Sequence, residues 1–236
     1  MCFLKRSQIN SIMQSAEAFI RQCRFHLPPF ADWTPKDWDE RRNEAGEILA
    51  NRLGWDITDF GSGNFQKCGL FLFTLRNGSP ENWKRMQGKL YAEKIMVVDP
   101  DQVTPMHFHW RKMEDIINRG GGNLIIQLYN STVDEKLDVE REVEITTDGV
   151  HRTLPPGGYV TLTPGESITL LPYCYHKFWG EDERVLVGEV SMVNDDHLDN
   201  HFADPIGRFP VIKEDEPPLH YLVTDYVRFK KGEITR

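Results

Sequence analysis

The sequence MHFHWRKME at residues 106–114, together with YCYH at residues 173–176, contains the side chains that decide the interpretation of this chain. Successive side chains of a β-strand point to opposite faces, so His107 and His109 share one face. A carboxylate follows at Glu114, and the second stretch ends in a separate imidazole. Three imidazoles and one carboxylate suit a divalent transition metal such as Mn, Fe, Zn or Ni, with coordination positions left for a substrate. The pattern predicts a catalytic metal centre.

The position of Glu114 requires a change in chain direction. It lies an odd number of residues after His109, so a regular strand would turn its carboxylate to the opposite face. We therefore expect a bulge or turn between Trp110 and Met113 that brings Glu114 back to the histidines. The two histidines alone could be an ordinary pair on a solvated strand face. The carboxylate and His176 favour the metal site.

Composition and charge limit the classes of protein that this chain can represent. It has 236 residues, of which 39% are hydrophobic and 27% charged, as in ordinary globular proteins. The net charge of -8 argues against nucleic acid or an anionic membrane as a partner. No apolar run approaches the roughly 18 residues needed to cross a bilayer, and the first six residues do not resemble a signal peptide. The four cysteines lack paired spacing, so we expect a cytoplasmic protein.

The spacing of apolar residues changes from helical to strand-like near residue 60. It predicts one helix over 7–24 and a second from Thr34, which can cap it, to about Leu53, with Gly54 at its end. Short runs rich in β-branched and aromatic residues then predict strands, with the glycines at 120–122 among the turns. The predicted strands are 70–75, 90–98, 123–130, 143–147, 158–163, 167–171 and 184–192.

Many short strands joined by tight turns predict a mainly β fold, an antiparallel barrel or sandwich with N-terminal α-helices packed outside. We expect the whole chain, 1–236, to form a single domain. Residues 1–58 would form a helical extension, 60–200 the barrel, and 201–236 a C-terminal segment that wraps the barrel surface.

The order of the candidate ligands resembles the two sequence motifs of the cupin superfamily. The His-x-His pair, four further residues and Glu114 correspond to the first motif, and Pro172-x3-His176 corresponds to the second. Asp101 stands where the first motif usually opens with glycine, and the second motif is one residue shorter and lacks its glycine. The resemblance implies a cupin-type jelly-roll barrel. We interpret the other histidines, which lack partners at ligand spacing, as structural or surface residues: His26, His151, His197, His201 and His220.

Four stretches make the resemblance more specific. They are Phe60-Gly61-x-Gly63, GLFLFTLRNG at 69–78, YAEKI at 91–95 and Pro105-Met106-His107-x-His109. In this order they resemble the D-lyxose ketol-isomerase family of cupin sugar isomerases, over roughly residues 5–228. The resemblance implies a Mn²⁺-dependent aldose–ketose isomerase that acts on D-lyxose and D-xylulose, often also on D-mannose and D-fructose, and is commonly a homodimer. It implies His107, His109, Glu114 and His176 as metal ligands, with Co²⁺, Fe²⁺ or Zn²⁺ as alternative ions.

Moving a proton between C1 and C2 of a sugar requires a base as well as polarisation of the carbonyl. Glu189 is the candidate base, because it shares a strand face with Val185 and Val187 and points inward if those valines line the barrel. Burial would then raise its pKa. If the face of Leu186 is the core one instead, Glu189 is solvated.

Two further residues are candidates for sugar binding. Lys94 interrupts an apolar strand and could neutralise charge on a sugar oxygen or relay a proton, unless it is a surface lysine. Asp204 could close over the cavity and bind hydroxyls, or form an ordinary turn before Pro205. Three aromatic residues flank the ligands and could shield the site from water: Trp110, Phe178 and Trp179. Two polar residues, Gln66 and Lys67, lie in a loop-like segment that could contact the sugar.

Two other functions use the same ligand set. An Fe(II)-dependent cupin dioxygenase would need the same three imidazoles and one carboxylate. A non-catalytic sugar-binding cupin would not need Lys94 and Glu189 within its strands, so these residues favour an enzyme. A carboxylate beside a metal favours an enediol intermediate over hydride transfer.

Overall fold

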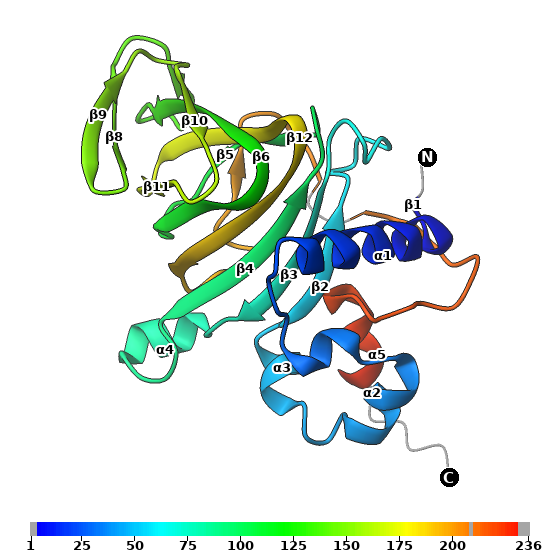
Figure 1. The fold of residues 1–236 in the computed structure, drawn as a ribbon. Coiled ribbons are helices and arrows are strands. Elements are labelled where there is room, and N and C mark those ends of the chain that lie inside the picture. Colours follow the sequence, from blue (N-terminus) through cyan, green and yellow to red (C-terminus); the bar gives the residue numbers. More distant parts are fainter. Residues whose placement is uncertain (1–3, 208–209, 231–236) are drawn as a thin grey trace.

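The computed structural model describes residues 4–207 and 210–230 as an antiparallel β-barrel with most of its helices packed against one outer face (Figure 1). The barrel strands are β2 (Gly54–Thr58), β3 (Leu70–Arg76), β4 (Tyr91–Val98), β5 (Thr104–Phe108), β6 (Glu114–Ser131), β7 (Leu137–Asp138), β8 (Val143–Thr147), β9 (Val150–Leu154), β10 (Tyr159–Leu162), β11 (Ser167–Leu170), β12 (Cys174–Met192) and β13 (His201–Phe202). The main path through this sheet is β2-β3-β4-β12-β6-β11-β8-β9. The predicted mainly β architecture, with N-terminal helices outside, is confirmed.

Two long strands, β6 and β12, run side by side through the whole barrel. The glycines at 120–122, which we expected to form a turn, lie inside β6, and β6 pairs with β12 on both sides of them. Gly121 has a φ of +93°, and a Cβ added to it would lie 2.1 Å from the carbonyl oxygen of Arg184. Glycine therefore lets the two strands bend while they stay paired. The predicted strands 123–130 and 184–192 are parts of these longer strands.

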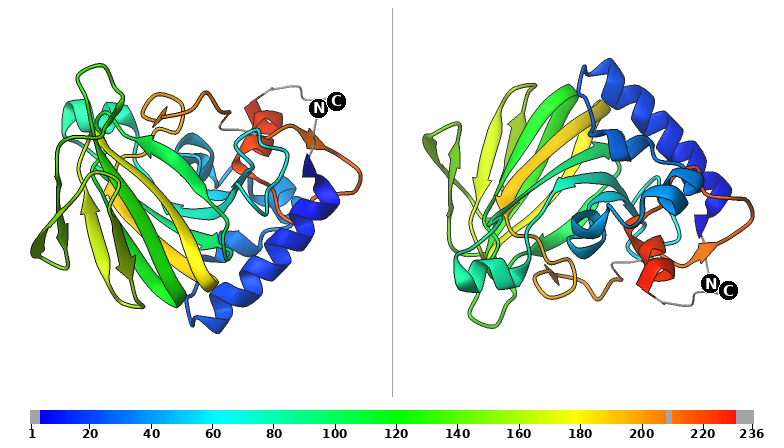
Figure 2. Two further views of the ribbon diagram at one scale, coloured as in Figure 1. Left: turned by 90° about the horizontal axis from the view of Figure 1, so that it is seen from above. Right: turned by 90° about the horizontal axis from the view of Figure 1, so that it is seen from below.

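The two faces of the sheet contribute to two separate hydrophobic cores. Val185 and Val187 of β12 belong to the core inside the barrel, whereas Leu186 between them belongs to the core beneath α1 (Arg6–Gln22). Figure 2 shows α1 lying alongside the outer face of the sheet. The apolar residues that α1 buries there recur at helical spacing: Ile9, Met13, Ala16 and Ile20. Because the valines line the barrel, a residue two positions further along β12 also faces inward, as predicted for Glu189.

The predicted second helix is interrupted. Thr34 caps α2 (Pro35–Arg41) as expected, since its hydroxyl accepts a hydrogen bond from the N–H of Asp37 at 3.3 Å. The helix ends at Arg41, however, and a separate short helix, α3 (Gly46–Ala50), follows after a turn. Gly46 is a poor helix former, so tertiary packing rather than local propensity decides the path of this segment.

Gly54, which we expected to end that helix, instead begins β2. Its φ is +119°, and a Cβ added to it would lie 2.6 Å from the hydroxyl oxygen of Tyr226. Glycine therefore allows a close approach between β2 and the C-terminal segment. The N-terminal extension is consequently not helical throughout, because its last five residues form a strand of the barrel sheet.

The C-terminal segment returns to the barrel and to the helical layer. β13 pairs with β5 and places Phe202 opposite His107, while β14 (Ile212–Lys213) pairs with β1 (Leu4–Lys5). Part of the predicted wrap over 201–236 lies outside the described residues. Within the described residues, every helix is too short or too polar to cross a membrane. The remaining short helices are η1 (Pro29–Asp32), α4 (Pro80–Arg85), η2 (Val223–Tyr226) and α5 (Val227–Lys230).

Candidate metal centre

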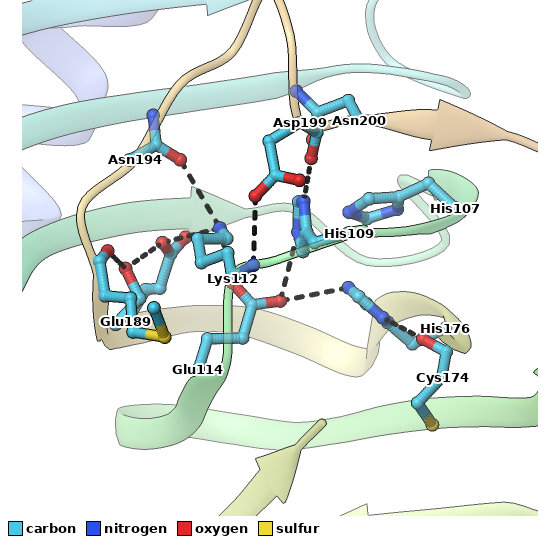
Figure 3. Close-up of polar contacts among 12 residues, drawn as sticks. His107, His109, Lys112, Glu114, Cys174, His176, Glu189, Asn194, Asp199 and Asn200 are labelled. Carbon is cyan, nitrogen blue, oxygen red and sulfur yellow. Dashed lines mark hydrogen bonds and ion pairs between the residues drawn. The ribbon is translucent and has the colours of Figure 1, made fainter. Parts of the chain in front are cut away.

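The four predicted ligands come together inside the barrel (Figure 3). His107 lies in β5, His109 follows that strand, Glu114 begins β6, and His176 of β12 pairs with His107. Ligand nitrogens of the three histidines lie within 4.8 Å of one another. Oε1 of Glu114 lies 3.4 Å from Nε2 of His109 and 3.1 Å from Nε2 of His176. All four side chains are buried.

The bend expected between Trp110 and Met113 is present, because β5 ends before this segment and β6 begins after it. A residue from a distant loop holds the bend in place. The carboxylate of Asp199 accepts hydrogen bonds from the backbone N–H groups of Arg111 and Lys112, at 3.0 and 2.9 Å. Asp199 thereby fixes the change of direction that turns the carboxylate of β6 toward the histidines.

The hydrogen bonds of the imidazoles define which ring nitrogen carries the proton in the neutral form. Nδ1 lies 2.8 Å from a backbone carbonyl oxygen in His107, 2.6 Å in His109 and 3.0 Å in His176. A carbonyl oxygen only accepts hydrogen bonds, so each Nδ1 carries a proton, and in the neutral ring the lone pair lies on Nε2. The carbonyl groups belong to Pro105, Asp199 and Cys174, in that order.

The Nε2 atom of His176 shows that a cation fits here. This atom is buried and has no hydrogen bond to any residue that the structure describes, although Oε1 of Glu114 lies 3.1 Å away. In the neutral ring with Nδ1 protonated, both facing atoms carry lone pairs, and a cation between them would satisfy both. Burial lowers the pKa of His107 well below 6.5, and burial together with Lys112 lowers the pKa of His109. Both imidazoles are therefore neutral, as metal ligation requires.

Two buried lysines and two buried glutamates form a charge network beside the histidines. Nζ of Lys112 lies 2.6 Å from Oε2 of Glu114 and 2.9 Å from Oε1 of Glu189. Nζ of Lys94 lies 3.2 Å from the same oxygen of Glu189. The amide oxygen of Asn194 accepts hydrogen bonds from both lysines, at 2.7 Å from Lys94 and 3.3 Å from Lys112. Lys112 thus links a candidate ligand to the candidate base.

The pKa of Glu189 differs from the expectation. Burial raises it, as predicted, but the positive charges of Lys112 and Lys94 lower it by more, so the pKa lies below its usual 4.5. Glu189 is therefore a buried but ionised carboxylate. Ser191 donates a further hydrogen bond to Oε1 of Glu189, at 3.0 Å. The prediction of a raised pKa was wrong because the sequence did not show that Lys112 and Lys94 would both lie beside this carboxylate.

These residues line a cavity that is charged in one part and apolar in another. Lys94 and Glu189 face it, as the sequence predicted, and so do Lys112 and two polar residues of the segment after β12, Asp196 and Asn200. The apolar residues that line it are Phe60, Leu70, Leu72, Met96, Ile116, Phe178 and Phe202. A polar ligand could enter this cavity and reach both the histidines and Glu189.

Other predicted residues lie elsewhere. Asp204 is exposed and borders a separate surface hollow, so the structure does not bring it to the metal centre. Gln66 and Lys67 are exposed as well. Of the three aromatic residues that flank the ligands, Phe178 lines the cavity, whereas the indole N–H of Trp110 donates to Glu135 outside it. The five remaining histidines are not part of the metal-binding group found among the described residues.

Sequence reasoning missed Lys112, Asn194 and Asp199. A lysine two residues before a candidate ligand was a visible signal, because a bend that turns Glu114 inward can also turn Lys112 inward. The two residues of the 193–200 loop had no such signal. Their roles depend on where a loop crosses the barrel opening.

This barrel, with three buried imidazoles and a carboxylate beside a buried ion network, defines a cupin-type fold whose histidine group could hold a metal ion. Comparison with known proteins gives the particular family. The family model described as D-lyxose isomerase matches residues 4–226, and the chain belongs to this family.

Curated relatives agree with that assignment. A D-lyxose/D-mannose isomerase of Serratia proteamaculans is 50% identical over 229 residues, which is 96% of this chain and 99% of the relative. A D-lyxose/D-mannose isomerase of Escherichia coli O157:H7 is 49% identical over 96% of this chain and 100% of its own length. A D-lyxose ketol-isomerase of Cohnella laeviribosi is 31% identical over 76% of this chain and 98% of its own length.

Solved structures confirm the fold. L-ribose isomerase of Acinetobacter sp. DL28 in complex with L-ribose has a TM-score of 0.59 at 16% identity, over 90% of this chain and 99% of that one. The unliganded L-ribose isomerase of Cellulomonas parahominis gives 0.56 at 15% identity, over 90% of this chain and 100% of that one. The family assignment confirms the expectation of an aldose–ketose isomerase and disfavours the dioxygenase and the passive sugar binder.

Proposed function

We propose that this enzyme interconverts D-lyxose and D-xylulose, and also D-mannose and D-fructose, by proton transfer through an enediol. The observation that carries the proposal is a buried, ionised Glu189 in the same cavity as three imidazoles that present Nε2 lone pairs. The two relatives at about half identity, both named D-lyxose/D-mannose isomerase, support the choice of sugars.

The residues proposed to hold the metal are His107, His109, Glu114 and His176. Mn²⁺ is the proposed ion, with Co²⁺, Fe²⁺ and Zn²⁺ as alternatives that accept the same nitrogen and oxygen donors. When bound, the ion would act as a Lewis acid that polarises the sugar carbonyl and makes the neighbouring C–H acidic. Lys112, bonded to Glu114, keeps that carboxylate oriented and ionised.

Glu189 is the proposed base that moves the proton between C1 and C2. Its carboxylate is held by Lys112 at 2.9 Å and by Ser191 at 3.0 Å, so it is oriented before the sugar arrives. Nζ of Lys94 lies 3.3 Å from the other carboxylate oxygen, and we propose that it neutralises charge that develops on a sugar oxygen. Asp196 and Asn200 face the cavity from the 193–200 loop, and we propose that they, rather than the expected Asp204, contact sugar hydroxyls.

The proposal is tested by metal removal and by a variant of the base. Chelation is expected to abolish lyxose–xylulose interconversion, Mn²⁺ to restore it, and the product formed in deuterated water to carry solvent deuterium at the carbon that accepts the proton. Glu189→Gln is expected to retain Mn²⁺ and lose most turnover. Full activity of metal-free protein would refute the metal centre, and wild-type turnover of Glu189→Gln would remove this residue from the reaction.

We further propose that the enzyme is a homodimer in the cytoplasm. The family resemblance supports the dimer, and the free thiols of Cys23, Cys68 and Cys174 are compatible with a reducing compartment. Light scattering coupled to gel filtration measures the mass in solution. A monomer at working concentration would refute the dimer.

A further inference from the structure

Two buried polar atoms of the same cavity lack a hydrogen bond. Among the residues that the structure describes, these are Nε2 of His176 and the hydroxyl oxygen of Thr104, and both residues line the cavity. Buried polar atoms are almost always satisfied in native proteins, so each unsatisfied atom needs an explanation. A metal ion would explain the imidazole. The threonine hydroxyl, which is outside the ligand set, points to a second ligand.

A bulge in β5 places Thr104 on the same interior face as the histidines. In the pairing of β5 with β12, His107 lies opposite His176, but Thr104 lies opposite Phe178. Three residues of β5 therefore match two of β12, and the bulge compensates for the odd spacing between Thr104 and His107. Two residues of β12 correspond to about 7 Å along the strand. Thr104 is thus displaced from the histidines by a distance comparable with the length of an extended pentose.

The surroundings of Thr104 leave its hydroxyl available. Thr104 is 3% exposed, and two apolar cavity residues adjoin it in the sheet. Phe178 is its partner on β12, and Leu70 follows Gly69, whose N–H donates a hydrogen bond to the carbonyl oxygen of Val103, the residue before Thr104. An apolar wall alone would disfavour a sugar hydroxyl, because the hydroxyl would lose its bonds to water. A threonine hydroxyl both donates and accepts, so it can replace those bonds.

We propose that the hydroxyl of Thr104 binds the O4 or O5 hydroxyl of the open-chain sugar, at the end remote from the reacting carbons. This inference rests on the proposed function, in which C1 and C2 lie beside the histidines and Glu189. Thr104 is then a residue that recognises substrate without taking part in proton transfer. Its loss should weaken the binding of every sugar that carries the remote hydroxyl.

The variants Thr104→Val and Thr104→Ser separate the hydroxyl from the shape of the side chain. Thr104→Val is expected to lower kcat/KM for D-lyxose about 10-fold, mainly through KM, which is the loss of one neutral hydrogen bond. Thr104→Ser should retain most of the wild-type value. Thr104→Val should melt no earlier than wild type, because the change removes an unsatisfied buried hydroxyl. Thr147→Val is the matched control, since the hydroxyl of Thr147 is also buried without a partner but Thr147 does not line the cavity.

Deoxy sugars identify the partner of the hydroxyl. If Thr104 binds O4 or O5, the wild-type enzyme should show a kcat/KM about 10-fold lower for the 4-deoxy or the 5-deoxy analogue, respectively, than for lyxose. In Thr104→Val, removal of the same sugar hydroxyl should cause no further decrease in kcat/KM. Two results would overturn the inference when the wild-type enzyme is active on lyxose. One is an unchanged KM in Thr104→Val. The other is a decrease in kcat/KM that is equal for both analogues and adds to the decrease caused by Thr104→Val. A wild-type enzyme that does not convert lyxose would overturn the proposed function, and this inference with it.

Discussion

Removal of the Asp199 carboxylate, which is not a metal ligand, should lower both the stability of the protein and its affinity for the metal. Asp199 is 7% exposed, and its two oxygens accept the N–H groups of Arg111 and Lys112 at 3.0 and 2.9 Å. Hydrogen bonds to a charged group contribute roughly 1.5–3 kcal/mol each. Because Arg111 is exposed, water can replace one of the two bonds. We therefore expect Asp199→Ala to lower the free energy of unfolding by about 3 kcal/mol, near the lower limit for two such bonds.

The same substitution should weaken metal binding. The bend that Asp199 holds carries the chain from His109 to Glu114, and its own backbone carbonyl accepts the Nδ1 proton of His109 at 2.6 Å. Loss of groups that orient ligands costs about 10- to 100-fold in metal affinity. Asp199→Asn, which retains one accepting oxygen without the charge, should give an intermediate loss in both quantities.

Two measurements check this prediction. Urea denaturation of the metal-free protein, followed by circular dichroism, gives the change in stability, and calorimetric titration with Mn²⁺ gives the change in affinity. Asp204→Ala is the matched control, because this carboxylate is exposed and lies outside the cavity. Metal affinity equal to wild type in Asp199→Ala would show that the bend does not depend on this carboxylate, even if stability fell.

Two further predictions concern buried charges. Lys112→Met should destabilise the metal-free protein by about 3–5 kcal/mol, because Glu114 and Glu189 would lose the cation between them, and an unchanged urea midpoint would contradict this. Burial lowers the pKa of His220, but the carboxylate of Glu17 at 3.1 Å and a backbone carbonyl raise it above 6.5 overall. A raised folded-state pKa stabilises the protein fully below the unfolded value, and this contribution is lost as pH rises through the folded pKa. His220→Gln should therefore destabilise the metal-free protein more below pH 6.5 than well above it, and equal losses at both would exclude this role.

Residue spacing alone determined several features of the site. The spacing of two placed His107 and His109 on one face, and the odd spacing to Glu114 required the bend that the structure contains. The valines on alternate positions of β12 predicted that Glu189 faces inward, and it does. These inferences succeeded because side-chain direction along a strand is a local property of the backbone.

Other features depended on contacts between distant segments. Asp199 reaches the bend 87 residues away in sequence from Lys112, and the lysines that lower the pKa of Glu189 lie on other elements of the barrel. The glycines at 120–122 form part of a strand rather than a turn because β12 supplies hydrogen-bond partners on both sides of them. The hydroxyl of Thr104 faces the cavity because of a bulge between paired strands. Local spacing sets the direction of a side chain, whereas its electrostatic surroundings and hydrogen-bond partners depend on which distant residues the barrel brings beside it.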